Sequence, residues 1–335
     1  MNETDPNERR ERLAEERAAQ RRWVQRGKGP HNDFIEALVA SEFMSEENQV
    51  RSSEERLQHL LQYVNANVPY YRELFANCDF CPEDFRELND LAALPTFNKE
   101  TIREHGELMR TERLPEGDVD AGESSSSGST GVPINIRQTY LSRLTGVLLT
   151  QRQLRWYGFD PLKEMHAIRG ARRFPLNNGK RLEPGQTLML RAWPGVGQLF
   201  VTGRFFGLAY ENPLEHQAVW LHQQNPAYLF STTTTLEHLA FSFQDRQPPP
   251  RLTGVRVMSE PLTLIQEANI EQRLGAPVHI SYGLDEIGWV ATRCSAGNRY
   301  HVHREHCLVE IVDNEGKPTP PGSFGRILVT VLSNA

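Results

Sequence analysis

The sequence predicts an α/β protein with mostly parallel sheets, crossover helices and a C-terminal antiparallel β-segment. Between about residues 226 and 286, short apolar runs alternate with amphipathic segments in the order strand, helix, strand, helix, strand. This alternation is typical of parallel strands joined by crossover helices. Further along, "CLVEIVDNEGKPTPPGSFGRILVTVL" contains two strand-like runs around a turn-rich connection, which predicts an antiparallel pair.

The N-terminal residues 1–30 mix positive and negative charges and end in "GKGP", so we expect a charged flexible or helical extension. One domain is expected over residues 31–335. Its first strong helix is "SSEERLQHLLQYVNANVPYY", with Ser52 and Glu55 at the spacing of a capping box and Pro69 ending it. Four apolar side chains recur there at helical spacing: Leu57, Leu60, Leu61 and Val64.

The middle of the chain opens with a predicted helix, "TYLSRLTGVLLTQRQLRWYGF", and then becomes irregular. The basic segment "RGARRFPLNNGKRLEPGQ" reads as a surface loop. Its arginines, Arg169, Arg172 and Arg173, have the charge to meet a phosphate, but a solvated loop is the favoured interpretation.

The alternating region begins with the strand "AYLFS" and the helix "TTTTLEHLAFSF". It continues with the strand "GVRVM", the helix "SEPLTLIQEANIEQRLG" and the strand "VHISYG". Gly275 stands just past the second helix, as expected of a C-terminal cap.

Composition excludes several classes of function. The net charge of −6 gives no reason to expect binding to nucleic acid or to an anionic membrane. No apolar run approaches the length of a membrane span, and no signal peptide is visible. Four cysteines in 335 residues do not make a disulfide framework, so reduced thiols and a cytoplasmic location are expected.

Two polar segments follow predicted strands, where open parallel sheets bind ligands. "SEPLT" contains Glu260 and Pro261, and "SYGLDEIG" contains Tyr282, Asp285 and Glu286. A tyrosine ring stacks on a base, and a carboxylate holds Mg²⁺ that bridges phosphates. The alternative, equally weighted on these residues alone, is a core tyrosine and a surface acid.

The tract "SSSSGSTGVP" is either a linker or a phosphate-binding loop. Glycine turns and hydroxyls suit a nest of backbone N–H groups around an anion. Neither a Walker loop nor a serine-hydrolase elbow is present, and composition alone favours a linker.

Cysteines and histidines gather in "CSAGNRYHVHREHC". A zinc site built from Cys294, His301, His303 and Cys307 is one hypothesis, since zinc takes such ligands. Their spacing matches no standard zinc finger, so ordinary hydrogen-bonded histidines are favoured.

Several segments, taken in order, resemble the adenylate-forming enzymes. "SSGSTGVP" resembles their phosphate loop, "SEPLT" their adenine-contacting segment, and "SYGLDEIG" their Tyr-Gly-x-Thr/Ser-Glu motif. The flanking "VPYYRELF", "DLAALPTFNKETIRE" and "HVHREHCLVEIVDNEGKPTPPGSFGRILVTVL" resemble the phenylacetate–CoA ligase-like branch. The resemblance covers about residues 55 to 335 and implies the fold of the large N-terminal domain of such an enzyme.

That resemblance implies a reaction. ATP and a carboxylic acid of aryl or arylacetic type would give an acyl-adenylate and pyrophosphate, and the acyl group would pass to coenzyme A or another acceptor. Thr130 and Glu286 would be catalytic, with Mg²⁺ on Glu286 and adenine on Tyr282. The nucleotide would lie among Ser126, Ser127, Gly128, Ser129, Thr130, Gly131, Glu260, Pro261, Tyr282, Gly283 and Asp285.

Three departures from the family pattern stand out. Val132 replaces a frequent lysine, and Asp285 replaces a threonine or serine, which places an anion where the triphosphate is expected. After "LVTVLSNA" family members continue into a ribose-binding aspartate and a C-terminal lysine-bearing domain, for which no counterpart is expected here. We therefore predict that this chain binds ATP but turns over poorly.

Two other functions stay open: a catalytically degenerate nucleotide-binding or interaction module, and transfer of AMP to an acceptor other than coenzyme A. A small carboxylate is the expected partner, with neither nucleic acid nor membrane. A homodimer and a separately encoded C-terminal domain are further partner hypotheses.

Overall fold

The computed structural model describes residues 18–19, 21–26, 32–125, 134–175, 180–294 and 297–332. The chain divides into two compact units. The first unit takes residues 1–29, 150–282 and 292–300, and the second takes residues 30–149, 283–291 and 301–335. Helix α6 (Tyr140–Trp156), close to its predicted position, contributes residues to both units.

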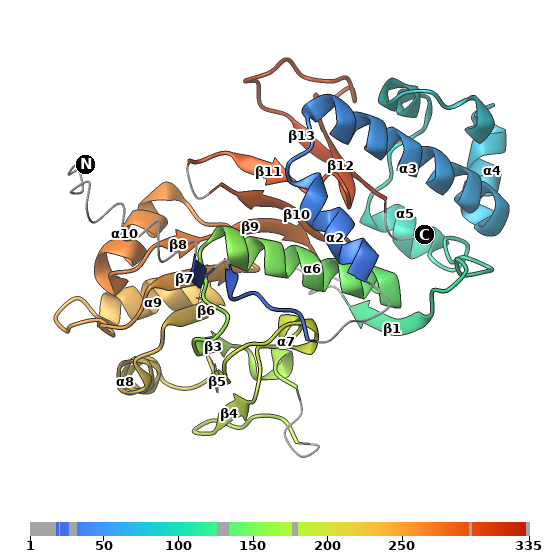
Figure 1. Cartoon of the computed structure of the whole chain (residues 1–335). Coiled ribbons are helices and arrows are strands. Elements are labelled where there is room, and N and C mark those ends of the chain that lie inside the picture. Colours follow the sequence, from blue (N-terminus) through green and yellow to red (C-terminus); the bar gives the residue numbers. More distant parts are fainter. Residues whose placement is uncertain are drawn as a thin grey trace. The chain divides into compact units, whose positions relative to one another are not determined.

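A six-stranded sheet of order β4-β5-β3-β6-β7-β8 forms the centre of the first unit (Figure 1). All neighbouring pairs are parallel except β4 and β5, so the predicted parallel sheet is confirmed. The strands are β3 (Met165–Arg169), β4 (Thr187–Leu190), β5 (Phe205–Ala209), β6 (Tyr228–Thr232), β7 (Gly254–Met258) and β8 (Val278–His279). Three of them, β3, β4 and β5, lie between residues 160 and 225, where no strand was predicted from the sequence.

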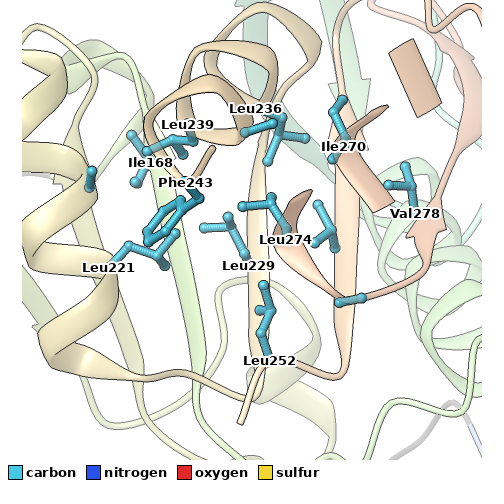
Figure 2. Close-up of a cluster of buried hydrophobic side chains, with 14 of the residues drawn as sticks. Ile168, Leu221, Leu229, Leu236, Leu239, Phe243, Leu252, Ile270, Leu274 and Val278 are labelled. Carbon is cyan, nitrogen blue, oxygen red and sulfur yellow. The ribbon is translucent and has the colours of Figure 1, made fainter. Parts of the chain in front are cut away.

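Three helices, α8 (Leu214–Gln224), α9 (Thr233–Ser242) and α10 (Leu264–Leu274), carry the apolar side chains that pack on one face of this sheet. Figure 2 shows the resulting core, in which Leu229 of β6 lies among Leu236, Leu252 and Leu274. Gly275 ends α10 with a φ of 70°, the predicted left-handed cap. The same unit also contains two short helical turns, η3 (Ala171–Arg173) and α7 (Val196–Leu199).

The short segment 21–26 is held against the rest of the first unit. Trp23 packs edge-on against Trp193 and Phe200, and its Nε1–H donates to the carbonyl of Phe159 at 3.1 Å. An isolated bridge pairs Gln25 with Phe200. Residues 23–26 of the predicted extension are thus docked on the rest of the first unit by the aromatic contacts of Trp23 and one isolated bridge.

The second unit is built around helix α3 (Glu46–Asn67), which buries Leu57, Leu61 and Val64. The helix begins earlier than predicted, because Ser45 rather than Ser52 caps its first turn and the polar turn after it stays helical. Its other helices are α2 (Asn32–Ser41), α4 (Pro69–Asn77), α5 (Lys99–His105), η1 (Pro82–Asp84) and η2 (Leu88–Ala93). Pro69 does follow the end of α3, and it also starts α4.

Antiparallel pairs make up the remaining β-structure. Strands β1 (Asp120–Ser125) and β2 (Asn135–Thr139) pair with each other, as do β12 (Cys307–Val312) and β13 (Arg326–Val331). The second pair confirms the predicted antiparallel C-terminal segment. A three-stranded sheet has the order β11 (Tyr300–Val302), β10 (Gly288–Arg293) and β9 (Ser281–Leu284).

The predicted single strand "VHISYG" is wrong, because the chain divides it between two sheets. Its first half is β8 of the parallel sheet and its second half is β9 of the three-stranded sheet. The break falls at Ile280, whose carbonyl accepts the hydroxyl of Tyr157 at 2.6 Å and the N–H of Arg293 at 3.3 Å. These two bonds take Ile280 out of the parallel ladder.

Candidate functional site

The candidate phosphate loop, Ser126 to Gly131, lies outside the described residues. Strand β1 comes before this segment in the sequence and strand β2 comes after it. The two strands pair with each other, and Ser125 at the end of β1 lies opposite Asn135 at the start of β2. The loop therefore links the ends of an antiparallel hairpin in the second unit. Two ion pairs brace that hairpin, Arg137 with Asp120 at 2.9 Å and Arg110 with Glu123 at 3.1 Å.

The segment that carries Glu260 and Pro261 begins directly after β7. Ser259 has a φ of 62°, a left-handed conformation that costs a residue with a side chain free energy and is often found at functional sites. Glu260 Oε2 accepts the N–H of Thr234 at 2.7 Å. The carboxylate thus caps helix α9 and fixes the strained turn at the carboxyl end of the sheet.

The Tyr-Gly segment lies on β9. The Tyr282 residue is 37% exposed, so it is not the core tyrosine of the alternative interpretation. Gly283 is required by close packing, because a Cβ there would lie 2.8 Å from the carbonyl oxygen of Gly288 and 3.0 Å from Trp289. Tyr282 is thus partly exposed, while the backbone beside it at Gly283 is closely packed.

Glu286 is the best-defined candidate in the second unit. Its side chain is only 16% exposed, and its Oε1 lies 2.6 Å from Nζ of Lys99. Lys99 is the first residue of α5, whose start is fixed by Asn98, which accepts the N–H groups of Glu100 and Thr101. An open hollow is lined by Asn98, Lys99, Glu100 and Arg103. The sequence suggested Glu286 as a site residue but not its lysine partner.

The turn after Glu286 is also anchored. Ile287 offers its carbonyl to Nε2 of His306 at 2.7 Å, and Gly288 has a φ of 85°. Burial lowers the pKa of His306 and so favours its neutral form, in which Nε2–H donates to that carbonyl. The buried His306 therefore fixes the backbone directly after Glu286.

The cysteine and histidine segment shows no metal site in the described residues, where no group of three or more histidine, cysteine, aspartate or glutamate side chains is arranged to hold an ion. Cys307 is buried, with its Sγ 3.8 Å from the carbonyl of Val290. Burial raises its pKa to about 12. His303 is fully buried in the second unit. The positions of these residues thus favour structural histidines over zinc ligands.

No family model matches the chain, but individual relatives do. Over 287 residues it is 28% identical to a phenylacetate–coenzyme A ligase of Thermus thermophilus, covering 84% of this chain and 61% of the relative. It is 27% identical over 288 residues to the enzyme of the same name from Escherichia coli, covering 83% and 62%.

The chain is related to the phenylacetate–CoA ligases. This confirms the resemblance inferred from the sequence. The alignment spans about three fifths of the length of these relatives.

Solved structures agree on the fold. An open conformation of 2-hydroxyisobutyryl-CoA ligase, in complex with 2-HIB-AMP and CoA, matches with a TM-score of 0.68 and 17% identity, covering 87% of this chain and 67% of that one. The thioesterification state of that ligase matches with a TM-score of 0.67 and 19% identity, covering 87% and 61%. The α/β fold class is therefore confirmed. In the described part of the chain, no helix combines the length and apolarity needed to cross a membrane.

Proposed function

We propose that this chain carries the nucleotide- and acid-binding residues of an AMP-forming acid–thiol ligase. The reaction would join a small carboxylic acid to AMP and pass the acyl group to coenzyme A. Support comes from the similarity to phenylacetate–CoA ligases along most of the chain. The observation that carries the proposal is the largely buried Glu286 carboxylate in the Tyr-Gly segment, held against a lysine.

Glu286 fits the Mg²⁺ that an ATP-dependent reaction implies. Mg²⁺ binds through one or two carboxylates together with substrate phosphates, so no three-ligand protein cluster is required. A bound Mg²⁺ would neutralise phosphate charge as the acid attacks. The Glu286 side chain offers oxygen of the right kind, and its closely packed turn limits its movement.

The other residues divide the binding of ATP between them. The exposed ring of Tyr282 suits stacking on adenine, and the turn at Glu260 and Pro261 suits backbone contacts to the base. Lys99, whose ammonium already balances Glu286, offers positive charge to a phosphate oxygen in place of the lysine that Val132 replaces. The hydroxyls and N–H groups of Ser126 to Gly131 would bind the β- and γ-phosphates.

The first experiment is a calorimetric titration of the wild-type chain and of the Glu286→Gln and Thr130→Ala variants with ATP and Mg²⁺. Each substitution is expected to weaken Mg²⁺–ATP binding by about ten- to a hundredfold, as loss of a charge-assisted contact does. The matched control is Glu315→Gln, because the Glu315 side chain is 73% exposed and its ion pair is with Lys317, two residues away. Wild-type affinity in Glu286→Gln would contradict the assigned role.

Catalysis itself needs a second measurement. Single-turnover mixing of the chain with ATP, Mg²⁺ and a panel of carboxylic acids, read by mass spectrometry, is expected to yield an acyl-adenylate and pyrophosphate. AMP attached to an added alcohol or phosphate acceptor, with no acyl-adenylate, would favour AMP transfer instead. Tight ATP binding without any adenylate would favour a degenerate binding module.

Lys99→Met tests the ion pair. Without its counter-ion, Glu286 is expected to bind Mg²⁺ a few-fold more tightly in the absence of nucleotide, since a half-exposed pair contributes at most about 1 kcal/mol. The same variant is expected to bind ATP more weakly, because a phosphate loses its cation. Unchanged affinity for both ligands would show that Lys99 has only a local structural role.

A further inference from the structure

Arg169 lies at the edge of the sheet where ligands bind in open α/β folds. It is the last residue of β3, and β5, β6 and β7 end at the same edge because all run parallel. Its guanidinium Cζ lies 5.6 Å from the centre of the Phe230 ring and 5.8 Å from that of Phe174. The side chain is therefore packed between aromatic rings instead of extending into a solvated loop, which corrects the sequence interpretation.

A second arginine flanks the same ring. Arg256 Cζ lies 5.1 Å from the centre of Phe230, and its side chain is almost completely buried, with the whole residue only 6% exposed. Strand register places Phe230 directly beside Arg256, and Arg169 points to the same face by the two-residue alternation of strands. One face of the sheet thus holds two neighbouring cations.

Gln153 adds a further donor to this face. Its Oε1 accepts Nη2–H of Arg256 at 2.6 Å, which leaves the amide nitrogen as a donor. Gln153 is fully buried, and within the described ranges neither its Nε2 nor Nε of Arg169 meets an acceptor. We call Arg169, Arg256 and Gln153 the donor cluster.

The chemistry of the donor cluster calls for an acceptor. Burial lowers the pKa of both arginines to about 10, and each also lies near another arginine, Arg173 beside Arg169 and Arg169 beside Arg256. Within the described ranges no carboxylate pairs with Arg169; Glu211, close to the same turn, accepts the N–H of Ala171. Within the described ranges, Nε of Arg169 and Nε2 of Gln153 are buried donors that meet no acceptor, and such donors are costly unless an acceptor joins them.

We propose that the acid bound by this protein carries a second oxyanion, such as a carboxylate, at the end remote from the reacting carboxyl, and that the donor cluster binds it. This inference rests on the proposed function and narrows the substrate to dianionic acids. Arg169 makes the first contact at the rim, where its planar fork suits a bidentate carboxylate. Arg256 and Gln153 add further hydrogen-bond donors deeper in the protein.

The test compares acids that differ in the distal group alone. Calorimetry with a non-hydrolysable ATP analogue present would measure 4-(carboxymethyl)benzoate against 4-methylphenylacetate, and adipate against hexanoate. The wild-type chain is expected to prefer the dianion in at least one pair by about ten- to a hundredfold. Arg169→Met should abolish that preference, because it should weaken the binding of the dianionic acid and leave the binding of the monoanionic acid unchanged. Arg172→Met, an exposed neighbour in the same turn, should keep it.

Two further variants keep the test decisive if Arg169→Met does not fold. Arg169→Lys retains charge without the fork and should keep part of the preference, while Gln153→Leu removes one donor and should reduce it. Equal affinity for both acids of each pair, or a preference that survives Arg169→Met, would overturn the inference. If the chain binds the ATP analogue but none of the dianionic acids, the inference is overturned and the proposed nucleotide site stands. If the chain does not bind the analogue, the proposed function itself is refuted.

Discussion

The two faces of the six-stranded sheet differ sharply although their residues alternate along the same strands. On the face covered by α8, α9 and α10, Leu229, Val255 and Val257 are buried in a cluster of apolar side chains. On the other, Phe230 and Arg256 meet Gln153 of α6. Consecutive residues of one strand therefore have different roles. Those on the first face stabilise the fold, and we infer that those on the second face bind a ligand.

This contrast separates what folding needs from what recognition needs. Apolar burial lowers the free energy of the folded state without demanding a particular partner. Buried donors raise that free energy until an acceptor arrives. Substitutions on the two faces should therefore differ in whether stability or binding changes.

Leu229→Ala should have the largest effect. The side chain is fully buried in the middle of the cluster in Figure 2, so its removal leaves a cavity between strand and helices. A loss of about 2–5 kcal/mol in the free energy of unfolding is expected from chemical denaturation. Leu264→Ala is the control, because Leu264 is 71% exposed on α10. Similar losses in both variants would mean that the cluster is not the main source of stability.

Gly254→Ala tests the opposite face. A Cβ at Gly254 would lie 2.8 Å from the Phe159 ring, which stacks on Tyr228 with 4.1 Å between centroids. Neither ring has room to retreat, so a loss of about 1–3 kcal/mol is expected. Gly146→Ala meets nothing within 4 Å and should be neutral or slightly stabilising in its helix. Equal stability of the two variants would contradict the packing described.

Each face also holds one neutral histidine. Burial is the main cause that lowers the pKa of His166 to about 4 and that of His279 to about 3, and neighbouring Arg293 and Arg256 further lower the second. In the unfolded chain both histidines have a pKa of 6.5, so below that pH the unfolded chain binds protons that the folded chain does not. The stability associated with the neutral histidines is therefore complete above pH 6.5 and is lost as the pH falls toward 4 for His166 and toward 3 for His279.

Denaturation between about pH 7 and pH 5 should show this loss, at up to about 1.4 kcal/mol per pH unit for each histidine. His166→Gln and His279→Gln should each flatten the pH dependence of unfolding. A dependence as steep as that of the wild type in both variants would assign acid sensitivity to other groups.

Arg256→Met should change stability least. A methionine has nearly the volume of the buried arginine and removes a desolvated charge, so a change within about 1 kcal/mol, in either direction, is expected. The measurement is the same denaturation series. A loss as large as that of Leu229→Ala would show that the cation serves the fold, and the contrast between the faces would fail.

Local patterns predicted the elements with strong periodicity. Strands β6 and β7 and helices α9 and α10 follow apolar runs bounded by Gly275 and polar turns, and they appear close to where the sequence put them. Strands β3, β4 and β5 were missed. "MHAIR" ends in a charged residue that reads as surface, because the aromatic partners that bury Arg169 come from distant segments.

The candidate site was only half predictable for the same reason. Glu286 stands in a motif that resembles a family pattern, but Lys99 is far away in sequence and no spacing links the two. The break at Ile280, which moves Tyr282 into another sheet, depends on Tyr157 and Arg293. A pattern within one segment carries no information about such partners.

The docked segment 21–26 supplies a built-in optical reporter. Trp23 and Trp193 lie edge-on with 5.9 Å between ring centroids, close enough for their electronic transitions to couple. Near-ultraviolet circular dichroism and tryptophan emission will therefore respond if the segment detaches, with no added dye. The same signal, recorded before any ligand is added, would show whether a label or purification tag placed before Trp23 disturbs this pair.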